Sequence, residues 1–471
     1  MTRSTARIDE ARINRRRDSP PGDGLVLYWM QQAQRAEQNP ALEYAIQQAN
    51  KLDKTLAVVF CVVPDYPEAS ARHFTFMLEG LQETEAALER RGIRFEALIG
   101  QPADVIEALG HRVALLVMDT GYLPTQRQWY EGVSEIYDGP VHQIETDVVV
   151  PTHLVSDRME TAARTIRPKI EHHLDNFIID LRTTALDKTS VAGGDSPVSL
   201  TRTARHFDAL DLSDVPAAVR TIGPPDEPGP VAEWSGGTAQ AKARLRHFCD
   251  TILPEYSTRR NHYDREDSSS KLSPYLHFGQ LSPVSIVDAA RSSGAPSDEV
   301  DAFVDEIVVR RELAINYVVH CDDFDGFGGL PEWARTTLND HRDDSRRKVV
   351  TARELEMGST DDELWNAIMN TIRNEGWVHN QLRMYWGKQI MYWTNTPEHA
   401  FRTLLSLNNK WFLDGRDPNS YANVAWCFGR HDQGFQERDV IGKVRPFTDQ
   451  ALRRKGDLDG WLERSQTRDE P

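Results

Sequence analysis

Three stretches in the second half of the chain combine residue types and spacings that suit binding or redox chemistry. The first is SSSKLSPYLHFGQLS (268–282), where a cluster of hydroxyls stands before a helix start and Pro274 lies near the first turn. Hydroxyls and free backbone N–H groups at a helix N-terminus can bind a phosphate or pyrophosphate. The same pattern is also an ordinary helix cap, and the sequence leaves both interpretations open.

Tryptophan is concentrated in the second stretch. Six of the eleven tryptophans fall within 62 residues, namely Trp365, Trp377, Trp386, Trp393, Trp411 and Trp426. Trp386 and Trp393 are seven positions apart, so they share one face of a helix. That face suits either packing in a core or a chain of redox-active rings, and spacing does not decide between them.

The third stretch is LNNKWFLDGRDPNSYANVAW (407–426), a polar segment with turn signals at Asp414-Gly415 and Asp417-Pro418. Arg383 precedes it in RMYWGKQIMYW (383–393). An arginine and an aspartate that face each other across a buried flavin would hold the ring and tune its charge. An ordinary ion pair between helices is the alternative.

Several other kinds of site have no signature in the sequence. There is no HExxH motif, and His172 and His173 are adjacent rather than on one helix face, so we predict no metal site. No GxSxG motif occurs either. The four cysteines form no CxxC pair, which is typical of a reducing cytoplasm. The basic N-terminus lacks the apolar segment of a secretory signal, so we predict a cytoplasmic protein.

Alternating strands and helices over residues 24–184 predict an α/β domain with a doubly wound, Rossmann-like parallel sheet. Short apolar runs rich in β-branched residues, as in buried parallel strands, lie at 24–30, 55–63, 94–100, 113–120 and 140–150. The first strand runs into Gln31-Gln32-Ala33-Gln34-Arg35 without a glycine. Because the phosphate turn of a dinucleotide site needs glycines there, we predict that this domain binds no nucleotide in that way.

The remaining chain divides into three predicted segments. Residues 1–23 carry six arginines without apolar periodicity, which predicts a flexible basic arm. Residues 185–237 are rich in glycine, proline, serine and aspartate, which predicts a linker. Amphipathic patterns from 238 to 465 predict an all-α domain, and the three chemistry-bearing stretches belong to it.

Length and composition agree with this division. A chain of 471 residues favours two domains. It is 39% hydrophobic and 27% charged, with no apolar run of membrane-helix length, so we predict a soluble protein without a membrane partner. The net charge of −17 neither supports nor excludes nucleic-acid binding, because the field at one face decides that.

Ordered motifs along the chain resemble those of the class II photolyases of the photolyase and cryptochrome family. The resemblance covers roughly residues 24–447, and DGRDPN following RMYW is its most specific element. The motifs are YWMQQAQRAEQNPAL (28–42), ETDVVVP (145–151), RTIRPKI (164–170), SPYLHFGQLS (273–282), RREL (310–313), RMYW (383–386), LNN (407–409) and DGRDPN (414–419).

The resemblance implies that the helical domain binds FAD, which is the catalytic cofactor of the family in its reduced form. Residues that match the family's phosphate-binding positions are Tyr256, Ser269, Ser270, Leu272 and Ser273. Arg383 and Asp414 match a pair beside the flavin ring, with Gly415 adjacent, and Asn408 matches the asparagine near flavin N5. An antenna pigment in the N-terminal domain, a deazaflavin or a folate, is possible in this family.

The resemblance also implies a site for damaged DNA. Glu306, Met384 and Trp426 match residues that line the pocket for a flipped pyrimidine dimer. Arg310 stands where some class II enzymes carry tryptophan in that pocket. Arg260, Asn261 and Arg445 match DNA-contacting positions. Trp386, Trp365 and Trp393 match the class II electron-transfer chain that reduces the flavin in light.

The function that the resemblance implies is light-driven repair of cyclobutane pyrimidine dimers by electron transfer from excited reduced FAD. Its catalytic residues would be Glu306, Asn408, Arg383 and Asp414, and a protonated Glu306 could donate a hydrogen bond to a developing anionic carbonyl. The partner would be UV-damaged DNA, bound by a monomer near the nucleoid if the source is prokaryotic. Alternatives are a cryptochrome-like photoreceptor, repair of the (6-4) photoproduct, and a nonenzymatic flavoprotein.

Overall fold

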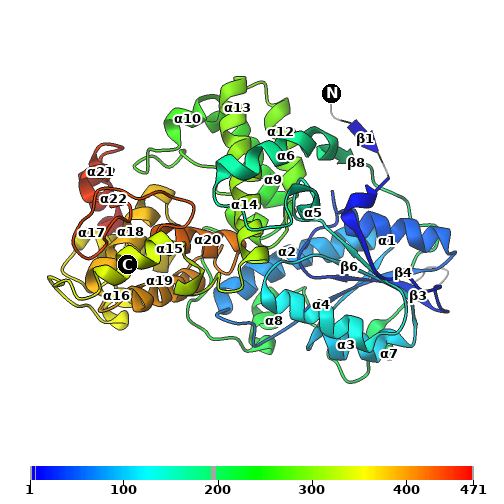
Figure 1. The fold of residues 1–471 in the computed structure, drawn as a ribbon. Coiled ribbons are helices and arrows are strands. Elements are labelled where there is room, and N and C mark those ends of the chain that lie inside the picture. Colours follow the sequence, from blue (N-terminus) through cyan, green and yellow to red (C-terminus); the bar gives the residue numbers. More distant parts are fainter. Residues whose placement is uncertain (1–2, 6, 192–197, 469–471) are drawn as a thin grey trace.

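A six-stranded sheet forms the centre of the N-terminal half in this computed structural model, which describes residues 3–5, 7–191 and 198–468 (Figure 1). The strand order is β2-β7-β6-β3-β4-β5. Five strands are parallel, and the edge strand β2 runs antiparallel to β7. The strands are β2 (Ile13–Arg17), β3 (Leu25–Met30), β4 (Leu56–Val62), β5 (Arg94–Ile99), β6 (Val113–Asp119) and β7 (Val141–Ile144).

Helices cover both faces of the sheet, because successive side chains of a strand point to opposite faces. Tyr28 and its alternate neighbours pack with α1 (Pro40–Lys51) and α2 (Ala71–Arg90). Trp29, on the other face, packs with α3 (Pro102–Gly110) and α4 (Pro124–Ile136). Burial on both faces explains why the strands read as continuous apolar runs. The predicted doubly wound α/β fold is confirmed.

The predicted flexible arm is wrong for residues 13–17, which form the edge strand β2. Before it, Arg12 is buried, and its guanidinium donates to the carbonyls of Glu145, Val148 and Val149. Upstream, β1 (Arg3–Thr5) pairs with β8 (Ile179–Leu181). A charged edge strand pairs through backbone hydrogen bonds and needs no apolar face. Its sequence therefore lacks the apolar pattern by which a strand is predicted.

Part of the predicted linker is also ordered structure. Residues 198–222 include α7 (Leu200–Thr203) and α8 (Val215–Ile222), which pack on opposite faces of the α/β domain. Their buried apolar side chains are widely spaced among polar residues, so the composition of a linker concealed them. The linker prediction for residues 192–197 lies outside the described residues.

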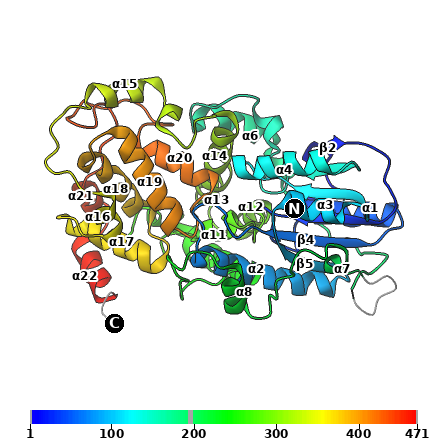
Figure 2. The same cartoon turned by 90° about the horizontal axis from the view of Figure 1, so that it is seen from below.

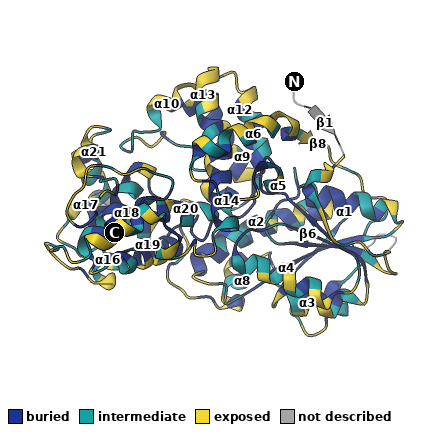
Figure 3. Cartoon of the chain, in the orientation of Figure 1, coloured by how far each residue is buried: buried dark blue, intermediate teal, exposed yellow. Residues whose placement is uncertain are grey.

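The helical half of the molecule contains two apolar cores (Figures 1 and 3). One core is built from α6 (Ala163–Phe177), α9 (Thr238–His247), α10 (Tyr256–Arg259), α11 (Ser273–His277), α12 (Pro283–Ser292) and α13 (Ser297–Val304). The other is built from α14 (Arg311–His320), α15 (Glu332–Asp340), α16 (Ala352–Met357), α17 (Glu363–Glu375), α18 (Asn380–Trp393), α19 (Pro397–Trp411), α20 (Pro418–Cys427), α21 (Asp449–Arg453) and α22 (Leu458–Arg468).

The two halves meet at the start of α2, which lies against the helical half (Figure 2). Arg72 donates to the carbonyls of Ile372 and Trp411, and His73 contacts the carbonyl of Phe412. These contacts join the α/β domain to backbone carbonyls at the ends of α17 and α19. Within the described ranges, no helix is long and apolar enough to cross a membrane.

Candidate functional site

One cavity between the two helical cores brings together nine of the nineteen residues that the sequence singled out. It has a volume of about 1190 Å³, part of it open to solvent. The predicted residues that line it are Tyr256, Arg260, Ser269, Ser270, Leu272, Ser273, Glu306, Arg383 and Asp414. These residues come from segments up to 158 positions apart, so the fold and not local sequence creates the site.

The serine cluster forms one wall of this cavity. Ser269, Ser270 and Ser273 line it, and the Ser269 hydroxyl is buried without a hydrogen-bond partner among the described residues. A buried hydroxyl without a partner is costly, so a ligand oxygen at this wall would restore the lost bond. Because α11 spans only five residues, the hydroxyls and not a long helix dipole make this wall suitable for a phosphate.

Arg383 also lines this cavity, and its side chain contacts two polar partners. Its guanidinium nitrogen Nη1 lies 3.1 and 3.3 Å from the two carboxylate oxygens of Asp414, and Nη2 donates to the Asn408 side chain. The guanidinium also lies 3.7 Å from the ring centroid of Phe412. The predicted pair of Arg383 and Asp414 is therefore present, and Asn408 joins it.

Gly415 acts through the shape of the adjoining turn. A Cβ atom at this position would lie 2.7 Å from the carbonyl oxygen of Asn409 and 2.9 Å from that of Asn408. Only glycine fits this close approach to the end of α19. Gly415 thus positions Asp414 and does not itself line the cavity.

Glu306 and Arg260 form an ion pair at the cavity wall. Their side chains are 2.6 Å apart and about one third exposed, and Arg260 lies 5.2 Å from the ring centroid of Tyr256. In this arrangement Glu306 accepts a hydrogen bond. The sequence-based expectation of a protonated Glu306 that donates one would require Arg260 to leave the carboxylate.

The other predicted DNA-contacting residues do not line the cavity. Asn261 accepts a hydrogen bond from Gln381 at 2.9 Å. Arg310 is half exposed and pairs with Asp305 at 3.3 Å, and Arg445 makes a bidentate pair with Asp432 at 2.7 and 2.8 Å.

Two further predicted pocket residues continue from the cavity along its helices. Met384 directly follows Arg383 on α18, and Trp426 follows Asn423 by three positions on α20. Residues three apart lie on the same face of a helix. Both side chains are partly buried against the apolar core. Neither side chain is among the residues that line the cavity, so their place in a dimer pocket stays a prediction.

Three predicted tryptophans form a continuous row. The rings of Trp386 and Trp365 stack with centroids 5.4 Å apart and planes 9° apart. Trp365 meets Trp393 edge to face at 5.3 Å. Trp386 and Trp365 are buried, whereas Trp393 is partly exposed. At the inner end, Trp386 lies 5.7 Å from Phe412, the ring beneath Arg383. The row runs from the Arg383 wall to the surface.

The structure adds a buried polar network that sequence reasoning missed. Arg311 and Asp417 line the cavity. Arg311 pairs with Asp147 at 2.6 Å, and Asp417 lies 3.4 Å from His277. Burial would raise the pKa of Asp417, but its contacts with His277 and the charge of Arg311 lower it to about 2. These residues belong to the RREL, ETDVVVP, DGRDPN and SPYLHFGQLS motifs. Their presence in motifs of the family was the one feature of the sequence that could have pointed to this network.

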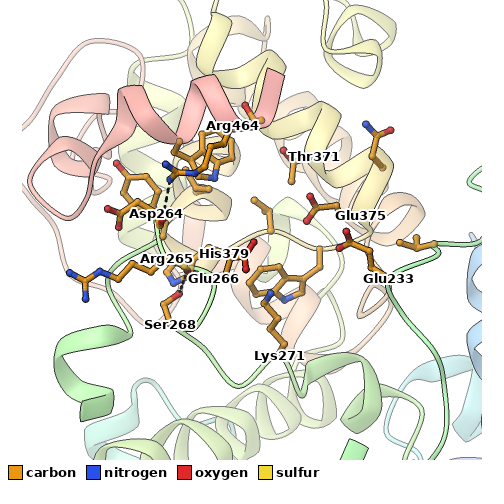
Figure 4. A pocket seen from close by; sticks show the side chains of 18 of the residues that line it. Glu233, Asp264, Arg265, Glu266, Ser268, Lys271, Thr371, Glu375, His379 and Arg464 are labelled. Atoms are coloured by element: carbon orange, nitrogen blue, oxygen red, sulfur yellow. Dashed lines mark hydrogen bonds between the residues drawn. The ribbon is translucent and has the colours of Figure 1, made fainter. Parts of the chain in front are cut away.

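A second cavity lies beyond the wall that contains Lys271, Trp377 and His379, which line both cavities (Figure 4). Figure 4 shows Asp264, Arg265, Glu266, Glu375 and Arg464 around it. Burial lowers the pKa of His379 to about 4, so its ring is neutral near pH 7. Its Nδ1 accepts from the backbone of Gln381 and thereby caps α18. Charges of both signs line this second cavity, which gives it no single electrostatic preference.

A third hollow lies at the carboxyl ends of β3 and β4. Residues that line it include Gln31, Gln34, Phe60, Trp129 and His277, and its volume is about 630 Å³. Carboxyl ends of strands near a change of strand order are the usual ligand sites of open α/β sheets. Here the order changes beside β3, because β4 and β6 lie on its two sides.

Together, a doubly wound domain and a helical domain that encloses a polar cavity beside a tryptophan row define the architecture of photolyases and cryptochromes. Two solved structures share this fold. A Synechocystis cryptochrome has a TM-score of 0.69 at 16% identity, covering 95% of this chain and 89% of that chain. An archaeal photolyase from Sulfolobus tokodaii, solved with two FAD molecules, has a TM-score of 0.67 at 14% identity, covering 95% and 91%.

Sequence comparisons place the chain more narrowly. The family model described as DNA photolyase matches residues 26–188. A deoxyribodipyrimidine photo-lyase of Methanothermobacter thermautotrophicus is 38% identical over 442 residues, which is 93% of this chain and 94% of that protein. The Arabidopsis thaliana protein of the same name is 33% identical over 450 residues, covering 93% and 88%. The chain belongs to the DNA photolyase family.

Proposed function

We propose that this protein is a class II photolyase that uses light to split cyclobutane pyrimidine dimers in DNA. The observation that carries the proposal is one cavity lined by the serine cluster and by Arg383 and Asp414, with Asn408 bound to Arg383 and the tryptophan row beginning beside them. Relatives named deoxyribodipyrimidine photo-lyase, aligned over most of the chain, support the same function.

The cavity residues fit FAD. Ser269 offers a buried hydroxyl without a protein partner, and Tyr256, Ser270, Leu272 and Ser273 lie beside it for the diphosphate. Arg383, Asp414 and Asn408 would hold the flavin ring. When bound in its reduced form, FAD would supply a light-excited electron donor: the bonds linking the pyrimidines would break once one electron has entered the dimer, and that electron would then return to the flavin.

The residues near Glu306 would receive the flipped dimer. Linked pyrimidines have lost part of their stacking and are cheap to extrude from the duplex. Trp426 would replace that stacking, with Met384 beside it. If Arg260 moves to a DNA phosphate, Glu306 loses its ion-pair partner and becomes free to hydrogen-bond the dimer. Arg310, Asn261 and Arg445 would contact the surrounding DNA.

The function is tested by measuring repair with purified full-length protein. We expect a coloured preparation that releases FAD on denaturation. Under blue light, reduced protein should restore oligonucleotides that contain a cyclobutane dimer and leave those with a (6-4) photoproduct unrepaired. A preparation that binds FAD but repairs neither lesion would instead favour a cryptochrome-like photoreceptor.

DNA binding is tested through its salt dependence. For Arg260→Ala, we expect weaker binding and a slope of log affinity against log salt that is smaller by about 0.9, because one phosphate contact is lost. Arg291→Ala is the matched control, since Arg291 is an exposed arginine that pairs with Asp175 and does not line the cavity. Equal slopes for the Arg260 variant and wild type would remove Arg260 from the DNA interface.

We further propose that the hollow beyond β3 and β4 holds an antenna pigment, a deazaflavin or a folate. Its lining combines aromatic rings with the amides of Gln31 and Gln34, which suits a flat ligand with polar edges. An absorption spectrum of the purified protein distinguishes the two pigments, and a spectrum of FAD alone would contradict the proposal. We also propose that the protein acts as a monomer in the cytoplasm.

A further inference from the structure

Lys388 lies on α18, one turn after Met384, and is buried with 1% of its surface exposed. The preceding Gly387 lets the end of α20 approach closely, because a Cβ atom there would lie 2.8 Å from the Cys427 sulfur. A full-length lysine side chain is therefore confined between α18 and the last turn of α20.

The ammonium of Lys388 has two contacts at that point. It donates a hydrogen bond to the carbonyl of Cys427, the last residue of α20, and it lies 5.0 Å from the centroid of the Trp426 ring. The last carbonyls of a helix have no partner in the helix and attract a positive charge. A single cation thus caps α20 and contacts the aromatic residue in its final turn.

Burial of this charge is not explained by an ion pair. Among the described residues, Lys388 forms no ion pair with a carboxylate, and Asp432, which influences it electrostatically, is paired with Arg445. A buried ammonium without a carboxylate partner costs stability. A methionine would fill the same space at lower cost, so the charge itself requires a role.

We propose that Lys388 is a positioning residue for damage recognition: it fixes the indole of Trp426 in the orientation that stacks on a flipped dimer. This inference rests on the proposed function, which assigns Trp426 to the dimer pocket. The hydrogen bond to Cys427 holds the helix end, and the cation holds the ring by attraction to its face. Without the ammonium, both the helix end and the ring gain freedom, and the stacking surface is no longer preformed.

Substitution of Lys388 tests the proposal directly. For Lys388→Met, we expect the affinity for dimer-containing DNA to fall about tenfold, since a desolvated cation–π contact and a helix cap are lost. Affinity for undamaged duplex and the bound FAD spectrum should stay unchanged. Lys388→Arg should recover most of the lost discrimination because it keeps the charge and the donor.

Lys410→Met is the matched control. Lys410 also lies over a tryptophan, 5.2 Å from the ring centroid of Trp411, but it pairs with Glu356 and does not line the cavity. We expect this variant to discriminate damaged from undamaged DNA as wild type does.

A measurement on the wild-type protein avoids any folding defect of a variant. Burial lowers the pKa of Lys388 to about 8, with Cys427 and Asp432 raising it and Arg445 lowering it. The cation is therefore lost as the pH rises through about 8, and discrimination should fall there. From about pH 8 to the usual lysine value of 10.5, the unfolded chain keeps a proton that the folded chain has released, so the destabilising contribution of the buried lysine shrinks as pH rises.

Above pH 8, the preference for damaged over undamaged DNA should fall, while the contribution of Lys388 to the free energy of unfolding should rise. Both changes should be absent in Lys388→Met. A lysine with only a structural role would not produce that opposition. Unchanged discrimination in a folded Lys388→Met protein, or equal losses on damaged and undamaged DNA, would overturn the inference. If the wild type repairs no dimer at all, the proposed function fails first, which separates the two conclusions.

Discussion

Two sets of tryptophan rings in the helical domain differ in what lies against them. In the row of Trp386, Trp365 and Trp393, each ring contacts the next ring, and in the described chain no cation lies over any of the three. Trp411 and Trp426 instead lie under cations. Arg72, Arg373 and Lys410 lie 5.2–5.7 Å from the Trp411 centroid, and Lys388 lies 5.0 Å from that of Trp426.

This difference has a chemical consequence. Removing an electron from an indole creates a positive charge, which a nearby cation opposes, most strongly where burial lowers the dielectric. Rings that lie against one another and under no cation therefore suit charge transfer, whereas rings beneath cations suit packing and recognition. The side chains around each tryptophan, and not its neighbours in the sequence, therefore distinguish the two sets.

The largest expected effect comes from breaking the row at its inner end. For Trp386→Phe, we expect light-driven reduction of oxidised FAD to be abolished, because the phenylalanine ring does not donate the electron that the flavin must receive. Repair by chemically reduced protein should persist. The measurement is bleaching of the flavin absorbance under blue light. Trp411→Phe, which alters a cation-covered ring, is the control and should bleach normally; normal bleaching in Trp386→Phe would make the row an ordinary core.

The next largest effect concerns a cation-covered ring. For Trp426→Ala, we expect affinity for dimer-containing DNA to fall about ten- to a hundredfold, since stacking of a base on an aromatic ring is worth about 1–3 kcal/mol. Binding to undamaged duplex, flavin photoreduction and the FAD spectrum should remain near wild type. Titrations with matched damaged and undamaged duplexes measure the ratio. Equal losses on both would assign Trp426 to a general contact or to folding.

How far the sequence could predict the molecule depends on the kind of signal. The doubly wound fold could be predicted from the sequence because strands such as β3 and β4 are buried on both faces and are therefore continuously apolar. The edge strand β2 was not, because charged residues on an edge strand pair through backbone groups that carry no side-chain signature. The packed part of the linker was hidden for a related reason, since a few buried leucines hold it among polar residues.

The candidate site divides in the same way. Resemblance to a family pointed to Arg383, Asp414 and the serine wall, and the structure brings them to one cavity. The pairing of Glu306 with Arg260 and the burial of Lys388 depend on how helices far apart in sequence approach each other. Helical periodicity shows which face a residue occupies but not which residue faces it, so these contacts required the three-dimensional arrangement.

The smallest expected effect concerns the outer end of the row. Trp393 is partly exposed and lines an open cavity that it shares with Tyr385 and Asp449, whereas Trp365 behind it is fully buried. For Trp393→Phe, we expect a partial loss of photoreduction in the presence of an external reductant. The positive charge left by electron donation then stops at the buried Trp365, which the reductant cannot reach, so the electron returns from the flavin more often. Trp461→Phe is the control, since Trp461 packs on the edge of the same core but lies outside the row. The loss should shrink as the reductant concentration rises, which a packing defect would not do. A loss as complete as that of Trp386→Phe would mean that all three rings are required, and no loss at all would end the functional row at Trp365.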